Sequence, residues 1–277
     1  MDWQKNITTD VRRALYEDLG NGDVSAQLID ADQTLQTSLL VREDAVLCGI
    51  DWFIESFHQC DPSIQFKWRA KDGDPVTANS VLCYISGPAR SLLTAERTAL
   101  NFLQTLSGTA TITHHYASRI RHTHCRILDT RKTIPQLRLA QKYAVSCGGG
   151  FNHRIGLFDA YLIKENHLAA CGGIAAAVHR GRVLNPGLLL EVEVESVPEL
   201  QQAIDAGADR ALLDNFSLAE IRRAVILNDG RIQLEASGNI TAQNLIAIAE
   251  TGVDFISIGA LTKHLRAVDF SLRFVSP

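Results

Sequence analysis

The sequence lacks several features that would assign it to a class at once. It has no run of about 18 apolar residues, which excludes a membrane-spanning helix. It has neither a G-x-G-x-x-G fingerprint nor a P-loop, so the common glycine-rich nucleotide motifs are missing. Its first residues show no basic start followed by an apolar core, so we expect no signal peptide and a cytoplasmic protein.

Paired cysteines are also missing. Six cysteines occur, no two of them spaced as C-x-x-C, at positions 48, 60, 83, 125, 147 and 171. This spacing argues against a zinc cluster and against a disulfide-rich scaffold. We therefore expect free thiols in a reducing compartment.

An excess of positive charge is absent as well. The 277 residues include 27 Lys+Arg and 31 Asp+Glu, which gives a net charge of −4. A dedicated nucleic-acid binder is usually basic. Because 46% of the residues are hydrophobic, disorder is excluded as the main state, and the length suits one large or two ordinary domains.

Two parts of the chain differ in their pattern. Residues 1–107 mix short strands, at 34–41 and 81–86, with helices. Residues 89–120 then form a mostly helical stretch that we expect Gly108 to interrupt.

From about residue 126, short apolar strands alternate with amphipathic helices. The predicted strands number six, and they cover residues 126–129, 160–163, 188–194, 210–213, 232–236 and 254–258. Six alternations imply a parallel sheet whose right-handed crossovers can close it into a barrel. An eight-stranded barrel needs about 250 residues and fewer are present, so we expect an irregular α/β barrel. The alternative is an open, doubly wound sheet.

Polar residues follow every predicted strand. The segments are 129–132 (DTRK), 164–167 (KENH), 214–215 (DN), 237–239 (SGN) and 259–260 (GA), with three glutamates on the strand at 188–194 and just after it. Because the carboxyl ends of parallel strands face one mouth, these side chains should converge. The alternative explanation is that strand ends are polar because they are exposed.

Charge is distributed unevenly along this part. Residues 126–164 contain seven basic and two acidic residues, whereas residues 191–220 contain eight acidic residues and one arginine. Cations gathered at strand ends in an acidic protein indicate an anionic small-molecule ligand. Glu191, Glu193 and Glu195 alternate with valines and should share one strand face, where cations, a metal or ligand hydroxyls must compensate them.

Several motifs together resemble the quinolinate phosphoribosyltransferase family. They lie in one order along nearly the whole chain, most densely from 95 to 167: AERTALN (95–101), SGTAT (107–111), DTRKT (129–133), KYAVSCGGG (142–150), NHRIGL (152–157), LIKENH (162–167), EVEVE (191–195), LDN (213–215) and SGN (237–239).

The resemblance implies an N-terminal α/β sandwich, residues 1–107 with residues 269–277 as a candidate addition, and an irregular α/β barrel over 108–268. It implies a transferase, more narrowly a pentosyltransferase (glycosyltransferase), that joins 5-phosphoribosyl 1-diphosphate to quinolinate with Mg²⁺. The products would be nicotinate mononucleotide, CO₂ and diphosphate, in de novo NAD (pyridine nucleotide) biosynthesis. A homodimer or higher even oligomer is also implied.

The resemblance further assigns roles to matching positions. Quinolinate carboxylates would be held by Arg131, His153, Arg154 and Lys164, with Arg97 coming from the partner subunit. The catalytic residues would be Lys132 and Lys164, which would lie near the diphosphate, and Glu193 and Asp214, which would bind the ribose hydroxyls. The 5-phosphate would be bound by backbone amides at Ser237, Gly238, Asn239, Gly259 and Ala260. Thr130 and Ile258 complete the expected substrate-binding set. The metal ligands are left open, with Glu193 and Asp214 as candidates acting through water.

Three rival interpretations remain at this point. Lys164 at a strand end could form a Schiff base in a barrel aldolase. A relative of the family associated with molybdenum transport need not catalyse the same reaction. A non-catalytic nucleotide-binding module would leave the acidic strand and most of the cations unexplained.

Overall fold

The computed structural model describes residues 3–274, and these fold as two compact units. The first unit contains residues up to 114 together with 133–149 and the segment from 261 onward. The second contains residues 115–132 and 150–260. The expected boundary at 107/108 falls inside a single helix, α3 (Ala89–Arg119).

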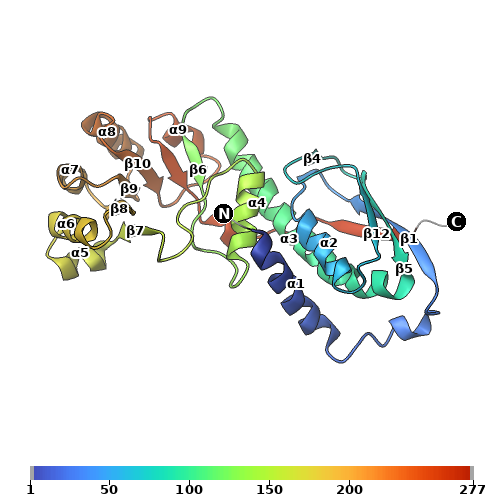
Figure 1. The fold of residues 1–277 in the computed structure, drawn as a ribbon. Helices are drawn as coiled ribbons and strands as arrows, with labels where there is room; N and C mark the ends of the chain where they lie inside the picture. Colours follow the sequence, from blue (N-terminus) through green and yellow to red (C-terminus); the bar gives the residue numbers. More distant parts are fainter. Residues whose placement is uncertain (1–2, 275–277) are drawn as a thin grey trace. The chain divides into compact units, whose positions relative to one another are not determined.

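The first unit is built on an antiparallel sheet with strand order β12-β1-β5-β3. The strands are β1 (Thr34–Val41), β3 (Gln65–Trp68), β5 (Val81–Pro88) and β12 (Phe270–Phe274), with a separate pair of β2 (Ala45–Val46) and β4 (Pro75–Val76). Its helices are α1 (Gln4–Leu19), η1 (Ala26–Leu28), α2 (Ile50–His58), most of α3, and α4 (Arg138–Cys147). Strand β12 pairs with β1 over five residues, so the end of the described chain belongs to this sheet (Figure 1).

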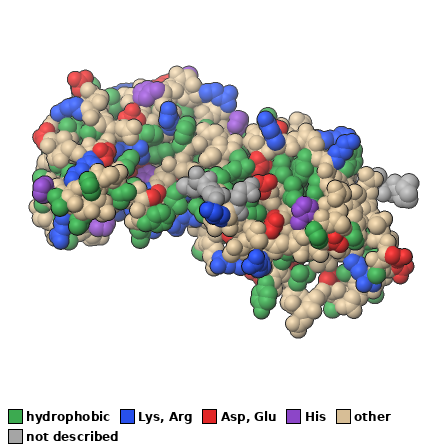
Figure 2. All heavy atoms as spheres, in the orientation of Figure 1, with side chains coloured by type: hydrophobic (Ala, Val, Ile, Leu, Met, Phe, Trp, Pro, Cys, Tyr) green, Lys and Arg blue, Asp and Glu red, His purple; other side chains and the backbone are tan. Residues whose placement is uncertain are grey.

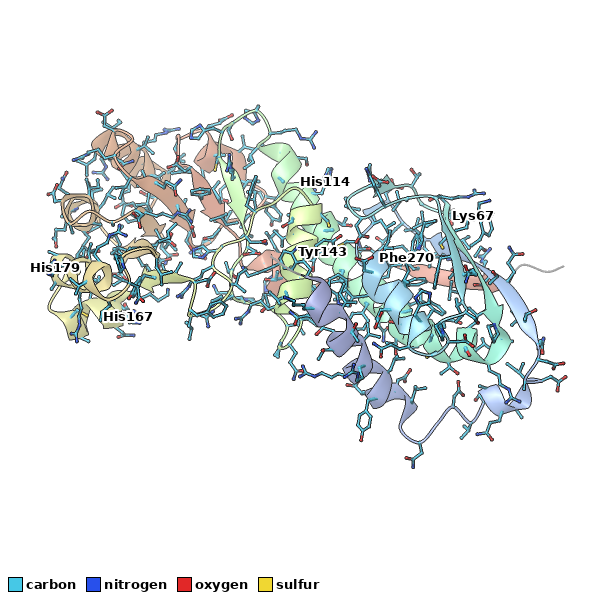
Figure 3. All side chains as sticks on the ribbon, in the orientation of Figure 1. Lys67, His114, Tyr143, His167, His179 and Phe270 are labelled. Carbon is cyan, nitrogen blue, oxygen red and sulfur yellow. The ribbon has the colours of Figure 1, made fainter. Side chains whose placement is uncertain are left out.

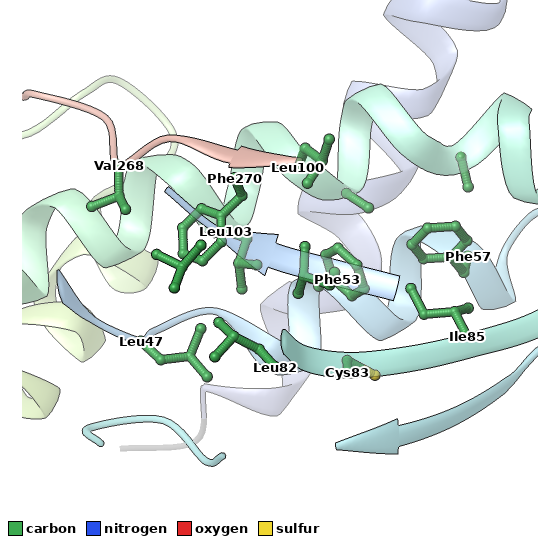
Figure 4. Packing of buried hydrophobic residues seen from close by; sticks show 14 of the residues in the cluster. Leu47, Phe53, Phe57, Leu82, Cys83, Ile85, Leu100, Leu103, Val268 and Phe270 are labelled. Atoms are coloured by element: carbon green, nitrogen blue, oxygen red, sulfur yellow. The ribbon is translucent and has the colours of Figure 1, made fainter. Parts of the chain in front are cut away.

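Aromatic and aliphatic side chains from α2, α3 and the sheet form the core of this unit. Phe53 and Phe57 of α2 are fully buried, and their rings lie 5.0 Å apart between centroids. Leu100 and Leu103 of α3 point into the same cluster (Figure 4). Burying each such side chain contributes about 1.5–3 kcal/mol, so this layer stabilises the unit.

The predicted interruption at Gly108 is wrong, because α3 continues through it to Arg119. A Cβ at residue 108 would lie 2.3 Å from the carbonyl oxygen of Arg266. The glycine is therefore explained by close backbone packing against a segment that is distant in sequence.

The second unit is a six-stranded parallel sheet with order β6-β11-β10-β9-β8-β7. The strands are β6 (Arg126–Leu128), β7 (Ala160–Ile163), β8 (Leu189–Val194), β9 (Arg210–Asp214), β10 (Gln233–Ser237) and β11 (Phe255–Ser257). Each lies within or beside its predicted range. In a closed barrel, the consecutive strands β6 and β7 would pair with each other. Here they form the two edges of the sheet, so the barrel is open between them, as the expected irregular barrel requires.

Helices connect these strands (Figure 1). They are α5 (Glu165–Cys171), α6 (Ile174–Leu184), α7 (Val197–Asp205), α8 (Leu218–Asn228) and α9 (Leu245–Ala249), and α10 (Ala260–Lys263) follows the last strand. Helix α9 begins only after Asn244, since Thr241 and Asn244 form a side-chain-bonded turn before it.

The surface carries charges of both signs among hydrophobic side chains over the visible face (Figure 2). Within residues 3–274, we find no helix that combines the length and apolar character needed to cross a membrane.

Candidate active site

A cavity of about 550 Å³ opens at the carboxyl ends of the second unit's strands. Residues from every strand of the parallel sheet or from the loop after it line the cavity: Thr130, Arg131, Lys132, His153, Arg154, Leu162, Lys164, Glu193, Leu212, Asp214, Glu235, Ser237 and Ser257. The predicted convergence of strand-end side chains is therefore confirmed. Four cations share the wall of this cavity: Arg131, Lys132, Arg154 and Lys164.

The segment after β6 brings three of these residues into the cavity. Lys132 donates its backbone N–H to the Thr130 hydroxyl at 3.1 Å, which fixes a tight turn. A Cβ at Gly259 would lie 2.8 Å from Cδ of Lys132, so the glycine after β11 leaves room for the lysine stem. The turn therefore aims Lys132 along the mouth of the cavity.

Arg131 and Arg154 are neighbouring cations. Burial lowers the pKa of the Arg154 guanidinium below its ordinary value, and the charge of Arg131 lowers it further. The Nε atom of Arg131 is buried without a hydrogen-bond partner among the described residues. Two adjacent guanidinium groups with an unused buried donor form a site for a dianion.

Lys164, Glu193 and Asp214 form a second charged group. Lys164 is the N-cap of α5, and its backbone N–H donates to Nδ1 of His167 at 3.1 Å (Figure 3 shows His167 on α5). Its ammonium pairs with Glu193. Burial raises the pKa of Asp214, the Glu193 charge raises it further, and Lys164 opposes this shift.

A buried ionic cluster borders the cavity, with His153 and Glu235 on the cavity wall. Glu191 on β8 and Glu235 on β10 are fully buried, with Nε2 of His153 at 2.9 Å from Glu191 Oε2 and 3.5 Å from Glu235 Oε2. Arg210 on β9 lies 3.4 Å from Glu235 Oε2. Burial raises the pKa of Glu191 to about 7. Burial and the charge of Glu191 raise the pKa of Glu235 to about 8.

These raised pKa values predict how stability depends on pH. In the unfolded chain both carboxyls titrate near pH 4.3, so between about pH 5 and 8 the folded protein retains protons that the unfolded chain has lost. The free energy of unfolding should fall as pH rises through this window, by roughly 1 kcal/mol per pH unit for each retained proton. Urea unfolding at about pH 5.5 and about pH 8 measures the slope. Glu235→Gln should make the unfolding free energy depend less on pH. If the variant shows the same pH dependence as the wild type, the assignment is wrong.

Sequence reasoning listed Asp129 only among the polar residues that follow its strand. Asp129 directly follows β6, is buried, and accepts hydrogen bonds from Asn152 Nδ2 at 2.7 Å and from the His153 N–H at 2.9 Å. Glu235 and Arg210 were not singled out. For Glu235 a signal existed, because period-two alternation places it on the same strand face as Ser237.

The turns after β9 and β10 form a smaller hollow of about 220 Å³ beside the cavity, lined in part by Ser237, Gly238 and Asn239. Asn239 Nδ2 donates to Asn215 Oδ1 at 3.2 Å. A Cβ at Gly238, whose φ is +90°, would lie 2.1 Å from that same oxygen. Only glycine suits this turn.

The other predicted residues lie at different places. Ile258 donates its N–H to the Leu128 carbonyl at 3.0 Å, so this amide is engaged within the sheet. Ala260 begins α10. Arg97 is exposed on α3 in the first unit. Glu195 lies past the end of β8 and is exposed, which corrects the expectation that it shares a face with Glu191 and Glu193. Substrate binding by each residue stays a prediction.

Two groups of side chains have metal-ligand character besides the cavity carboxylates. The ligand atoms of His153, Glu191 and Glu235 lie within 4.8 Å of one another, but Arg210 already supplies positive charge there. Cys48, Asp72 and Cys147 form the other group, in the first unit. There, Asp72 accepts hydrogen bonds from the N–H groups of residues 49 and 50 and from the Tyr143 hydroxyl.

Comparison with known proteins gives one consistent result. Models of the N-terminal and C-terminal domains of quinolinate phosphoribosyl transferase match residues 23–107 and 109–273. The nicotinate-nucleotide pyrophosphorylase [carboxylating] of Mycobacterium leprae (strain TN) is 40% identical, covering 95% of each chain. A probable enzyme of the same name from Bacillus subtilis (strain 168) is 39% identical, covering 92% of this chain and 89% of its own.

Solved structures agree with the sequence relatives. The nicotinate-nucleotide pyrophosphorylase from Francisella tularensis superposes with a TM-score of 0.95 at 51% identity, covering 98% of this chain and 96% of that one. An enzyme of the same name from Pyrococcus furiosus shares the fold, with a TM-score of 0.72 at 15% identity, over 98% of this chain and 76% of its own.

Proposed function

The chain belongs to the quinolinate phosphoribosyltransferase family, and we infer that the cavity at the strand ends is where it transfers the phosphoribosyl group to quinolinate. The donor is 5-phosphoribosyl 1-diphosphate, and the products are nicotinate mononucleotide, CO₂ and diphosphate, in de novo NAD synthesis. One observation carries the assignment of the site: Arg131 and Arg154 line the same cavity, the charge of Arg131 lowers the pKa of Arg154, and the buried Nε of Arg131 has no partner in the described chain. Such a pair suits the two carboxylates of quinolinate.

Binding of quinolinate by these arginines positions its ring nitrogen for attack on the anomeric carbon of the donor. As the C–N bond forms, the bond from that carbon to the diphosphate breaks, and the ring nitrogen becomes positively charged. The bond from ring C2 to its carboxylate then breaks, since the cationic ring stabilises the electron pair left on C2. That carbon takes up a proton, and no side-chain nucleophile takes part.

Lys132 and Lys164 supply positive charge near the departing diphosphate. Glu193 and Asp214 accept hydrogen bonds from the ribose hydroxyls. Their negative charge stabilises the positive charge that develops at the anomeric carbon in the oxocarbenium-like transition state. The Lys164 amine is engaged in an ion pair with Glu193, which argues against a Schiff-base role, because that chemistry needs a free, neutral amine.

The cavity also suits Mg²⁺. Glu193 and Asp214 are carboxylates at its wall, and burial raises the pKa of Asp214, which the Glu193 charge raises further. Mg²⁺ binds through one or two carboxylates together with substrate phosphates. We therefore propose that these two residues would hold the ion through water, where it would supply positive charge for the diphosphate.

The glycine turns beside the cavity complete the donor site. Gly238 and Asn239 form the hollow that adjoins Ser237, and Gly259 precedes α10. Backbone N–H groups at such turns approach a phosphate closely, so we assign the 5-phosphate to this part of the site.

The decisive experiment measures nicotinate mononucleotide formed from quinolinate and 5-phosphoribosyl 1-diphosphate, with Mg²⁺ and with a chelator. Product that depends on both substrates and on the ion supports the proposal. Absence of product under all conditions would contradict it, and binding without turnover would favour a non-catalytic module. The six free thiols fit the proposed cytoplasmic location.

The exposed Arg97 leads to a prediction about subunits. We propose that the protein is a homodimer or larger even oligomer in which Arg97 completes the partner's quinolinate site. Arg97→Ala and Lys164→Ala should each be nearly inactive alone. Mixed in denaturant and refolded together, they should regain roughly a quarter of wild-type activity, since half of the chains are in heterodimers and each heterodimer has one intact site. Absence of recovery in verified heterodimers would show that Arg97 acts within its own chain or elsewhere.

A further inference from the structure

Two cysteines that are far apart in the sequence meet in the first unit. Cys48 precedes α2, and Cys147 is the last residue of α4. Their Sγ atoms and a carboxylate oxygen of Asp72 all lie within 4.8 Å of one another. The spacing of the cysteines argues only against a zinc site built from neighbours in the sequence, so it does not reveal this group.

The backbone around these side chains is held in place. Cys48 donates its N–H to the Ser107 hydroxyl at 2.9 Å, and its carbonyl accepts a hydrogen bond from the same hydroxyl at 3.1 Å. A Cβ at Gly73 would lie 3.5 Å from the carbonyl oxygen of Cys147, so the turn that contains Asp72 lies against the end of α4. Three separate segments of the unit therefore position the three side chains before any ligand binds.

The hydrogen bonds of Asp72 orient its carboxylate and leave it able to bind a cation. Oδ1 accepts from the N–H groups of Gly49 and Ile50 at 3.1 and 3.2 Å, which uses both of its lone pairs. Oδ2 accepts from the hydroxyl of Tyr143 at 2.9 Å and keeps one lone pair (Figure 3 labels Tyr143 on α4). Carboxylates that bind metals are typically oriented by such outer hydrogen bonds.

The donor atoms select the kind of ion. With Zn–S at about 2.3 Å and Zn–O at about 2.1 Å, the ligand atoms of a tetrahedral zinc site are about 3.6–3.8 Å apart. The group needs to contract by only about 1 Å to reach that geometry. Two sulfurs and a carboxylate suit Zn²⁺, whereas Mg²⁺ prefers oxygen ligands. Cys48 is fully buried and Cys147 is half-buried, so an ion would enter from the Cys147 side.

We propose that Cys48, Cys147 and Asp72 form a zinc-binding site in the first unit, with water as the fourth ligand and Tyr143 orienting the carboxylate. Binding releases the protons of both thiols to solvent. The ion joins the end of α4 to the segments before α2 and β4, and so stabilises this unit.

The competing possibility is a disulfide between Cys48 and Cys147. Its formation removes two electrons and two protons, which a peroxide would accept as it is reduced to water. The charge of Asp72 favours the cation over the disulfide, because it attracts the ion and opposes the uncompensated thiolate that oxidation requires.

Zinc binding can be measured on the full chain without substrates. Protein that has been reduced with a phosphine and freed of metal is dialysed against Zn²⁺ in the presence of excess Mg²⁺. We expect one Zn²⁺ per chain that Cys147→Ser does not bind, and a rise in Tm of about 5 °C at a hundredfold excess of Zn²⁺ over Kd. Cys60→Ser is the matched control, since Cys60 is also a half-buried thiol of the first unit, and it should bind like the wild type. Zinc bound equally by Cys147→Ser, or none bound by the wild type, would overturn the proposal.

Co²⁺ in place of zinc identifies the ligands. The wild type should show a thiolate-to-cobalt charge-transfer band in the near ultraviolet, which Cys48→Ser and Cys147→Ser should weaken or lose. Asp72→Asn should raise Kd at least about tenfold, no less than the loss of an outer partner costs. Bound cobalt without this band would refute ligation by the thiols.

The mass of the protein before reduction tests the disulfide. A mass lower by two hydrogens, together with no zinc binding after reduction, would assign the pair to a disulfide and overturn the proposal. If Cys48→Ser does not fold, the cobalt spectrum of the wild type and the half-buried Cys147→Ser variant decide the matter. These measurements need no turnover, so their outcome is independent of the proposed function.

Discussion

Replacing Lys132 by alanine should lower kcat by about 10²–10³-fold, the size of effect seen when one preorganised donor to a developing negative charge is removed. Lys132 follows the Thr130 turn and its side chain passes Gly259 at the cavity mouth, so the turn directs its ammonium toward the substrates. The departing diphosphate gains charge only as its bond to the ribose breaks. The loss should therefore appear in kcat at saturating substrates, with little change in KM for quinolinate.

Two further variants make this test specific. Lys132→Arg keeps a positive charge but changes its shape and reach, so it should restore only part of kcat. Lys67→Ala removes an exposed lysine on β3 of the first unit, which Figure 3 labels, and should leave kcat unaltered. If Lys132→Ala also leaves kcat unaltered, the residue has no part in the chemical step.

The parallel sheet could be predicted from the sequence because its signals are local. Each strand is a short apolar run between turn residues, and the carboxyl ends of parallel strands meet whatever the details of packing. Arg131, Lys164 and Asp214 could therefore be placed around one cavity before any coordinates were known. Gly108 shows the limit, since the chain that crowds it lies at residue 266, more than 150 positions away.

The buried cluster shows a second limit of the sequence. Glu191, Glu235 and Arg210 come from three different strands, and their pairing depends on the register between neighbours: Glu191 is opposite Arg210, which is opposite Gln233. The spacing of these residues along the sequence does not reveal the register between neighbouring strands, so their pairing could not be predicted. Similarly, Asp129 resembled one more polar strand end, although it is fully buried and holds the loop of Asn152 and His153.

Arg131→Ala should raise KM for quinolinate roughly a hundredfold. Truncating one partner of a buried, hydrogen-bonded charge pair costs about 3 kcal/mol, and about 1.4 kcal/mol corresponds to a factor of ten. Because Arg131 acts on the bound carboxylate and not on the leaving group, kcat should fall much less than in Lys132→Ala. An unchanged KM for quinolinate would refute the assignment. Arg126→Ala is the matched control, since Arg126 begins the strand that Arg131 follows, at the end away from the cavity.

The same variant should not be less stable than the wild type in the absence of ligand. The charge of Arg131 lowers the pKa of Arg154 after burial has done so, and the buried Nε of Arg131 has no partner in the described chain, so Arg131 opposes the charge of Arg154 until an anion arrives. Removing Arg131 relieves that repulsion, and Tm without ligand should stay the same or rise. Quinolinate should then raise Tm of the wild type more than that of Arg131→Ala, because a ligand stabilises in proportion to its affinity for the folded state. A large loss of Tm without ligand would mean that Arg131 supports the fold, and the rise in KM could then no longer be attributed to a lost contact with the substrate.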